Sequence, residues 1–229
     1  MATIHLVRHG QASFGSDNYD QLSPTGWQQG KILGHWLAEK VAPSAVVAGK
    51  MQRHRETVEA MASGYGTPLP ALQTLDGLNE FDHVQVIQRY RPQWADKAVM
   101  KHELRSDPAP MKAFQHAFQE AVVRWVSGEH DHEYSETWQD FRQRVVAALT
   151  QLIEIADGGD VIVSTSGGPI AVIAQHLLDL SDRKTLEINS VIANTSVSRI
   201  LYSGSRRSLA VFNNYSHLEA EYPDLVTFR

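Results

Sequence analysis

Short apolar runs alternate along the chain with longer stretches in which apolar residues recur every three or four positions. A short run that is rich in β-branched residues and bounded by glycine or polar residues is typical of a buried strand. These runs predict strands at TIHLVRHG (3–10), SAVVAG (44–49), VIVS (161–164), SVSRILY (196–202) and SLAVFN (208–213), the last two joined by the turn SGSRR.

The longer stretches carry the start signals of helices. Ser23 followed by Pro24 is an N-cap with proline in the first turn, which predicts a helix over about 24–40. Thr137 and Asp140 form a capping box at the start of a long helix. The apolar stripes expected to face the core are Ile32, Leu33, Trp36 and Leu37 in the first helix, and Val145, Val146, Leu149, Leu152, Ile153 and Ala156 in the second.

Strands that alternate with helices predict an α/β fold, a three-layer α/β/α sandwich around a mostly parallel sheet. The stretch 84–133 is irregular and helical, with prolines as breakers, and we expect it to be a helical cap insertion. Its expected place is over the carboxyl ends of the strands, where sheets of this kind bind ligands. The whole chain, 1–229, is then one domain with a cap.

Composition narrows the function classes. The chain has 229 residues, 42% of them hydrophobic, and a formal net charge of −5 without a basic block, so we expect no nucleic-acid partner. No apolar run approaches the ~18–20 residues of a membrane span, and we expect no membrane partner. Cysteine is absent, which excludes disulfides and thiolate chemistry. We expect a cytoplasmic protein; the sequence leaves its oligomeric state open.

Polar groups follow several of the predicted strands directly. Arg8 and His9 follow the first strand, Arg53 lies on the first turn of the helix after the second, and Glu80 lies in the loop after a third. The segment 166–169, Ser-Gly-Gly-Pro, turns a strand into a helix, and backbone N–H groups at such a helix start bind anions. Because parallel strands end at one edge of a sheet, all these groups are expected to meet in one crevice.

Seven segments of the chain, in the order in which they follow one another, resemble the histidine phosphatase superfamily in its phosphoglycerate-mutase-like branch. The resemblance runs through most of the chain: LVRHG matches the N-terminal motif, LSPTGWQQ the L-[TS]-x-x-G-x-x-Q segment, and LNE the segment of the acidic residue. The remaining matches are AGKMQRHRET, SETWQDF, NTSVSRI and FNNYSHL. One RHG alone is a weak motif, whereas the ordered set is specific.

The resemblance implies roles for particular residues. His9 corresponds to the histidine that is phosphorylated, Arg8 and Arg53 to arginines that bind the phosphoryl oxygens, and Glu80 to the acid that protonates the leaving group. This chemistry needs neither metal nor cofactor, and its substrate is a small phosphorylated molecule. Further substrate-binding candidates are Ser23, His83, Ser166, Gly167 and Gly168.

One position departs from the family pattern. The family has a second histidine before a glycine, roughly S-H-G-G, where this chain has Thr165-Ser166-Gly167-Gly168, so Ser166 takes the place of that histidine. His83, in the loop of Glu80, is our first candidate for a substitute. His54 is about 100° around the helix from Arg53 and is expected to point away. His217 is expected to be structural.

The favoured function is therefore a phosphatase that works through phosphorylated His9; a mutase would need the missing histidine. One alternative is a weakly active or non-catalytic protein that binds phosphorylated ligands, which the replacement by Ser166 favours. The remote alternative is a serine hydrolase with Ser166 as nucleophile and His217 as base, although the G-x-S-x-G elbow is incomplete.

Overall fold

The computed structural model describes residues 2–13 and 20–228, and these form two compact units. The first unit consists of Met1–Glu80 and Arg144–Arg229, and the second of Phe81–Gln143. The second unit contains the whole of the predicted insertion 84–133. That this insertion caps the site within a single domain stays a prediction.

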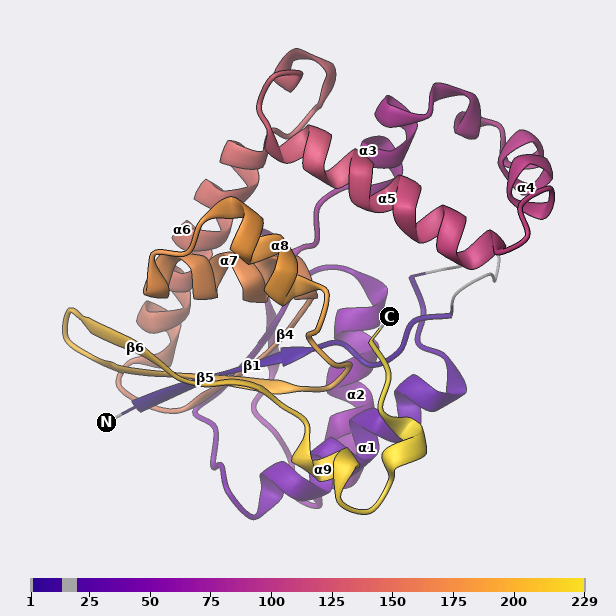
Figure 1. The fold of residues 1–229 in the computed structure, drawn as a ribbon. Helices are drawn as coiled ribbons and strands as arrows, with labels where there is room; N and C mark the ends of the chain where they lie inside the picture. The colour runs from indigo at the N-terminus through magenta and orange to yellow at the C-terminus, as the bar shows by residue number, and fades with distance from the viewer. Residues whose placement is uncertain (1, 14–19, 229) are drawn as a thin grey trace. The chain divides into compact units, whose positions relative to one another are not determined.

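A mixed sheet is the centre of the first unit (Figure 1). Across the described residues its strand order is β3-β2-β4-β1-β5-β6. The four strands from β3 to β1 are parallel, and β5 pairs antiparallel with both β1 and β6; this mixed sheet confirms the predicted α/β class. The strands are β1 (Ala2–Arg8), β2 (Ala45–Ala48), β3 (Leu72–Thr74), β4 (Val161–Thr165), β5 (Val197–Ser203) and β6 (Arg206–Asn214).

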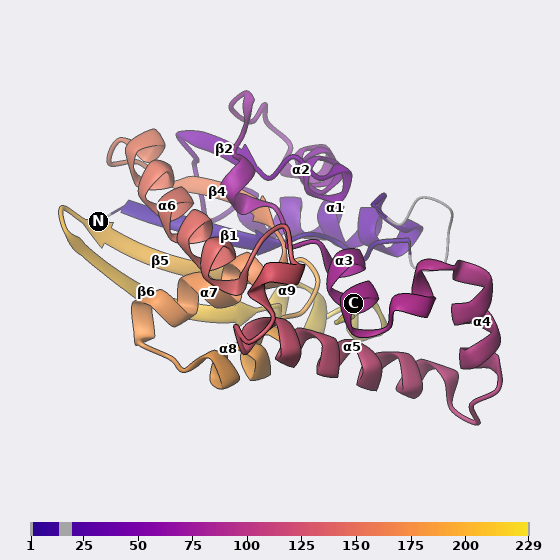
Figure 2. The ribbon, with the colours of Figure 1, turned by 90° about the horizontal axis from the view of Figure 1, so that it is seen from above.

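Helices cover both faces of this sheet (Figures 1 and 2). The pair α1 (Pro24–Ala38) and α2 (Gln52–Tyr65) lies on one face, and α7 (Gly167–Leu178) lies on the other beside the part of α6 (Trp138–Ala156) that belongs to this unit. Ser23 caps α1 and the Thr137–Asp140 box begins α6, as predicted. Two helices that the sequence pattern did not predict are α8 (Asp182–Asn189) and α9 (Ser216–Glu219).

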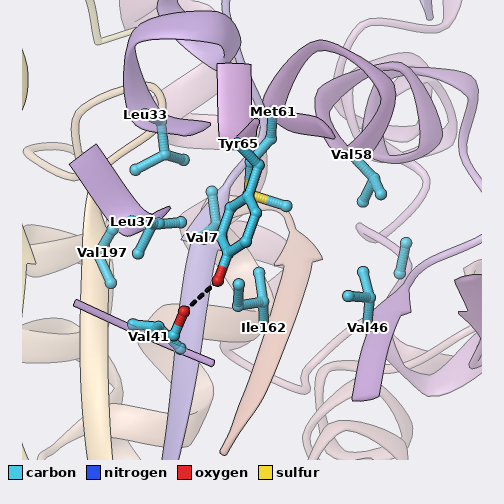
Figure 3. Packing of buried hydrophobic residues seen from close by; sticks show 11 residues of the cluster. Val7, Leu33, Leu37, Val41, Val46, Val58, Met61, Tyr65, Ile162 and Val197 are labelled. Carbon is cyan, nitrogen blue, oxygen red and sulfur yellow. Dashed lines mark hydrogen bonds between the residues drawn. The ribbon is translucent and has the colours of Figure 1, made fainter. Parts of the chain in front are cut away.

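The core between the sheet and the α1–α2 pair is apolar and dense (Figure 3). Val7 of β1 and Ile162 of β4 meet Leu33 and Leu37 of α1 and Met61 of α2. The buried face of α1 differs from the predicted stripe. Ile32 and Trp36 are only half-buried, and Gly26, Gly30 and Gly34 lie on the buried face instead. A side chain at Gly34 would strike the backbone of Met61, so these glycines let the two helices approach closely.

The second unit is helical and has its own aromatic core. Phe81, Trp125 and Phe141 pack against one another, with ring centroids 4.8–5.7 Å apart. Its helices are α3 (His83–Tyr90), α4 (Lys97–Arg105) and α5 (Pro110–Val126). Short 3₁₀ turns are η1 (Asp76–Leu78), η2 (Pro92–Ala95), η3 (Asp131–Glu133) and η4 (Pro223–Leu225), of which η2 and η3 belong to this unit. Within residues 2–13 and 20–228, no helix is both long and apolar enough to span a membrane.

Candidate functional site

His9 follows β1 directly and is held from three sides. Its backbone N–H donates to the carbonyl of Thr165 on β4 (2.8 Å), and its own carbonyl accepts from the side-chain amide of Asn194 (3.0 Å). The Nδ1 atom of its ring lies 2.7 Å from the carbonyl oxygen of Gly10. A carbonyl accepts only, so Nδ1 carries the ring proton and Nε2 keeps its lone pair.

Arg53 lies against that free nitrogen. Its Nε donates to Nε2 of His9 (3.2 Å), its Nη2 donates to Oγ of Ser166 (3.5 Å), and its Nη1 pairs with Asp20 at 2.6 Å. Nε and Nη2 lie on one edge of the planar guanidinium, so the His9 nitrogen and the Ser166 oxygen lie side by side along it. Burial first, and then the charges of Arg53 and Arg8, hold the pKa of His9 well below its usual value. The ring is therefore neutral at physiological pH.

Arg8, at the end of β1, completes the positive side of the site. Its Nη1 donates to the carbonyl of Ile192. A Cβ at Gly167 would lie 3.8 Å from the Arg8 Nε and 2.5 Å from Oδ1 of Asn189. The glycine in the turn therefore leaves room for the Asn189 side chain, while Arg8 lies at ordinary contact distance from the start of α7.

The turn from β4 to α7 is the strand–turn–helix that the sequence predicts, and an anionic side chain of the protein itself binds there. The backbone N–H of Gly168 donates to Oε2 of Glu80 at 3.1 Å. The loop that carries Glu80 is fixed by Arg144, whose Nη1 donates to the carbonyls of Gly77 (3.1 Å) and Asn79 (2.7 Å). Glu80 is thus oriented toward the turn by contacts on both sides.

His54 is the residue whose position we predicted wrongly. Instead of pointing away, its ring lies 5.7 Å from that of His9, and its Nε2 is 2.7 Å from Oγ of Ser166. Residues 53 and 54 lie on the first turn of α2, where the end of the helix faces the site. Two side chains about 100° apart can both reach groups that lie beyond a helix end, which an argument from helix faces overlooks.

The remaining candidates lie in two places. Ser23 caps α1, accepting from the N–H of Gly26 (3.1 Å), and its Oγ donates to Oε1 of Gln11 (2.8 Å), two residues beyond His9. His83 is the first residue of α3 in the second unit, and its role stays a prediction. His217 bonds to Thr195 and not to Ser166. No group of three or more His, Cys, Asp or Glu residues in the described part of the chain is arranged to hold a metal ion.

The chain matches the family model of the histidine phosphatase superfamily (branch 1) over residues 4–115 and 107–215. Among solved structures it is similar to a phosphoglycerate mutase from Bacillus anthracis, with 17% identity, 95% of each chain covered and a TM-score of 0.67.

Two further structures have the same fold. YhfR from Bacillus stearothermophilus is 19% identical, with 95% of this chain and 100% of that chain covered and a TM-score of 0.64. A mycobacterial glucosyl-3-phosphoglycerate phosphatase is 18% identical, with 93% and 99% covered and a TM-score of 0.57. No curated protein sequence gives a significant match. On the extent of the family match, this chain belongs to the histidine phosphatase superfamily, branch 1.

Proposed function

We propose that this protein is a phosphatase that hydrolyses a phosphate monoester through a phosphohistidine intermediate on His9. The observation that carries the proposal is the state of the His9 ring. It is neutral, its Nδ1–H is committed to the carbonyl of Gly10, and its Nε2 lone pair faces the guanidinium of Arg53. A neutral nucleophile suits a phosphate dianion, which would repel an anionic one.

In the first step the Nε2 lone pair of His9 attacks phosphorus, and the bond from phosphorus to the ester oxygen breaks. The leaving oxygen takes the bonding electrons and a proton from the carboxyl group of Glu80. In the second step water attacks the phosphohistidine, Glu80 takes a proton from that water, and the electrons of the N–P bond return to His9. The sum is ester plus water to alcohol plus inorganic phosphate.

The positive groups would bind the phosphoryl oxygens. Arg53 lies between His9 and Ser166, and Arg8 lies by the turn at Gly167, so a phosphoryl group on Nε2 would meet both guanidinium groups. The backbone N–H of Gly167 and the N-terminus of α7 would stabilise the same charge, whereas the Gly168 N–H binds Glu80 and would hold this acid beside the phosphoryl group. Ser23 is proposed to act through Gln11, and His83 remains a candidate substrate contact.

The substrate class is proposed to be a small phosphorylated molecule, bound without metal or cofactor, in the cytoplasm. The names of the similar structures support this class, because they include a phosphoglycerate mutase and a glucosyl-3-phosphoglycerate phosphatase. Hydrolysis is favoured over mutase chemistry because Ser166 stands at the position of the second histidine in the resemblance.

The second candidate function is a weakly active or non-catalytic protein that binds phosphorylated ligands. The observation in its favour is the same replacement by Ser166, since removal of one preorganised donor costs ~10²–10³ in rate. The presence of His54 beside Ser166 weighs against it.

The test is hydrolysis of p-nitrophenyl phosphate by wild type, His9→Ala and His35→Ala, with alkaline quenching and mass spectrometry to detect phosphohistidine. His35 is an exposed histidine on α1 and serves as the matched control. We expect turnover and a phosphorylated His9 peptide in wild type and His35→Ala, and neither in His9→Ala. Phosphate binding without turnover in wild type would establish the second candidate instead.

A further inference from the structure

A buried histidine and a buried serine meet beside the nucleophile. His54 on α2 and Ser166 at the start of α7 are both fully buried, and Nε2 of His54 is 2.7 Å from Oγ of Ser166. The Arg53 guanidinium, which touches Nε2 of His9, also donates to this oxygen. The His54–Ser166 pair therefore lies on the side of His9 where Arg53 would bind a phosphoryl group carried by Nε2.

The surroundings of His54 fix the direction of this hydrogen bond. Burial first, and then the charge of Arg53, keep the pKa of His54 well below its usual value, so the ring carries one proton. Within the described residues, Nδ1 of His54 is buried and has no hydrogen-bond partner. A buried N–H without an acceptor is rarer and costlier than a buried lone pair without a donor, so the proton is on Nε2 and is donated to Ser166.

The hydroxyl proton of Ser166 is then available for a ligand. Its oxygen accepts from His54 and from Arg53. No acceptor for its proton occurs among the hydrogen bonds of residues 2–13 and 20–228. Two donors on the oxygen make the hydroxyl a stronger donor, since hydrogen bonds in a chain polarise one another. The same arrangement opposes a serine nucleophile, because His54 gives a proton to Ser166 and takes none.

We propose that His54 and Ser166 together take the part of the second histidine: Ser166 donates a hydrogen bond to the phosphoryl oxygen, and His54 orients and polarises that hydroxyl. Ser166 is the group that touches the substrate, and His54 is a positioning residue that acts through it. The inference rests on the proposed function for its setting. It assigns a role to the histidine of the segment Arg53-His54-Arg55, which the family resemblance leaves without one.

The first test uses orthovanadate, an analogue of the phosphoryl group, and does not require turnover. Its dissociation constant is measured calorimetrically for wild type, His54→Ala, Ser166→Ala and the double variant. We expect each single variant to bind ~10–100-fold more weakly, and the double variant to be no weaker than either single variant by more than about threefold, because the two residues act as one unit. The proposal is overturned if the losses of vanadate affinity in the two single variants multiply in the double variant. It is also overturned if His54→Ala binds vanadate within threefold of wild type.

Two further variants distinguish positioning from simple loss of structure. His54→Gln keeps a side-chain N–H near the Nε2 position, and we expect it to recover vanadate affinity to within about fivefold of wild type. His217→Ala is the matched control, because His217 is also buried and bonded to a hydroxyl; it should lower the melting temperature and leave vanadate affinity unchanged. If His54→Gln binds as poorly as His54→Ala, the positioning role is wrong.

Turnover separates this inference from the proposed function. If wild type hydrolyses p-nitrophenyl phosphate and depends on His9, we expect His54→Ala to lower kcat ~10–100-fold with KM changed less than threefold. If wild type shows no turnover dependent on His9 but the vanadate results hold, the phosphatase proposal fails and the pair stands. If turnover depends on His9 but His54→Ala binds vanadate as tightly as wild type, the phosphatase proposal stands and the role of the His54–Ser166 pair is wrong.

Discussion

Among the described residues of the first unit, two histidine–hydroxyl pairs are buried. His54 lies 2.7 Å from Oγ of Ser166, and His217 lies 3.1 Å from Oγ1 of Thr195. Burial lowers the pKa of both histidines, to about 4 for His217, so both rings are neutral. In each pair the histidine and the hydroxyl come from different elements.

The hydroxyl proton separates the two pairs. Thr195 donates its proton to the carbonyl of Asn194 (2.8 Å), whereas we infer that Ser166 donates its proton to a bound phosphoryl group. Thr195 also has φ +56°, a strained backbone for a β-branched residue, and its N–H donates to the carbonyl of Arg8 (2.9 Å). His217 packs on Trp36, with ring centroids 5.6 Å apart. The same pair of groups can fix the backbone or serve a ligand, according to where the hydroxyl proton points.

The largest effect on activity should come from removing the Arg53 guanidinium, which contacts the His54–Ser166 pair and, among the described residues, has no counterpart at the His217–Thr195 pair. Arg53→Met deletes the donor to Nε2 of His9 and to Ser166, and we expect kcat/KM for p-nitrophenyl phosphate to fall ~10³-fold or more. Arg55→Met, an exposed arginine on the same helix, is the control and should stay within twofold. A loss below tenfold in Arg53→Met would mean that the guanidinium does not bind the phosphoryl group.

A smaller effect on activity should come from a substitution that displaces the His54 ring and leaves the residue itself in place. A Cβ at Gly49 would strike Nδ1 of His54 and lie 2.9 Å from Oδ1 of Asn79, so Gly49→Ala must displace the ring. We expect a loss of about 1–3 kcal/mol in the free energy of unfolding and ~10-fold in kcat. In the double variant with His54→Ala the clash with the ring is removed, while the close contact with Asn79 remains. Urea unfolding should then show part of the stability restored while kcat stays low; restored activity would contradict the role of His54.

The smallest effect should appear in the pH dependence of stability, which both pairs share. A histidine whose folded pKa is lowered takes up a proton in the unfolded state first, so stability is complete above about pH 6.5 and is lost as the pH falls toward the folded value. For His217, with a folded pKa of about 4, the loss between pH 7 and 5 is about 2 kcal/mol. Urea unfolding of His217→Gln should show a correspondingly flatter pH profile; an unchanged profile would place the acid sensitivity elsewhere.

The sequence predicted the strands and the first helices well, because the signals for these elements are local. The capping residues Ser23 and Thr137 and the short β-branched runs depend on a few neighbours, and the structure confirms them. The convergence of Arg8, His9 and Arg53 followed from parallel topology, since these residues follow strands that end at one edge of the sheet.

The parts that the sequence could not predict depend on where a helix ends relative to the sheet. His54 was misplaced because a periodicity argument assigns faces along a helix and says nothing about its first turn. Its signal was the histidine beside Arg53 together with the loss of the expected histidine at Ser166. Asn194 and Arg144 were missed because each binds backbone carbonyls of residues distant in sequence, and no local pattern reports that.

The position of β1 in the sheet has a consequence for how the protein folds during synthesis. β1 lies between β4 and β5, with Ile4 opposite both Val161 and Ile200, so the strand that leads to His9 pairs only with segments made much later. During synthesis β1 has no partner strand in this sheet until β4 has been made, and its other edge stays unpaired until β5 follows. The phosphate-binding groups therefore assemble late in folding, and ribosome-bound fragments that end before β5 lack the completed sheet edge on which His9 depends.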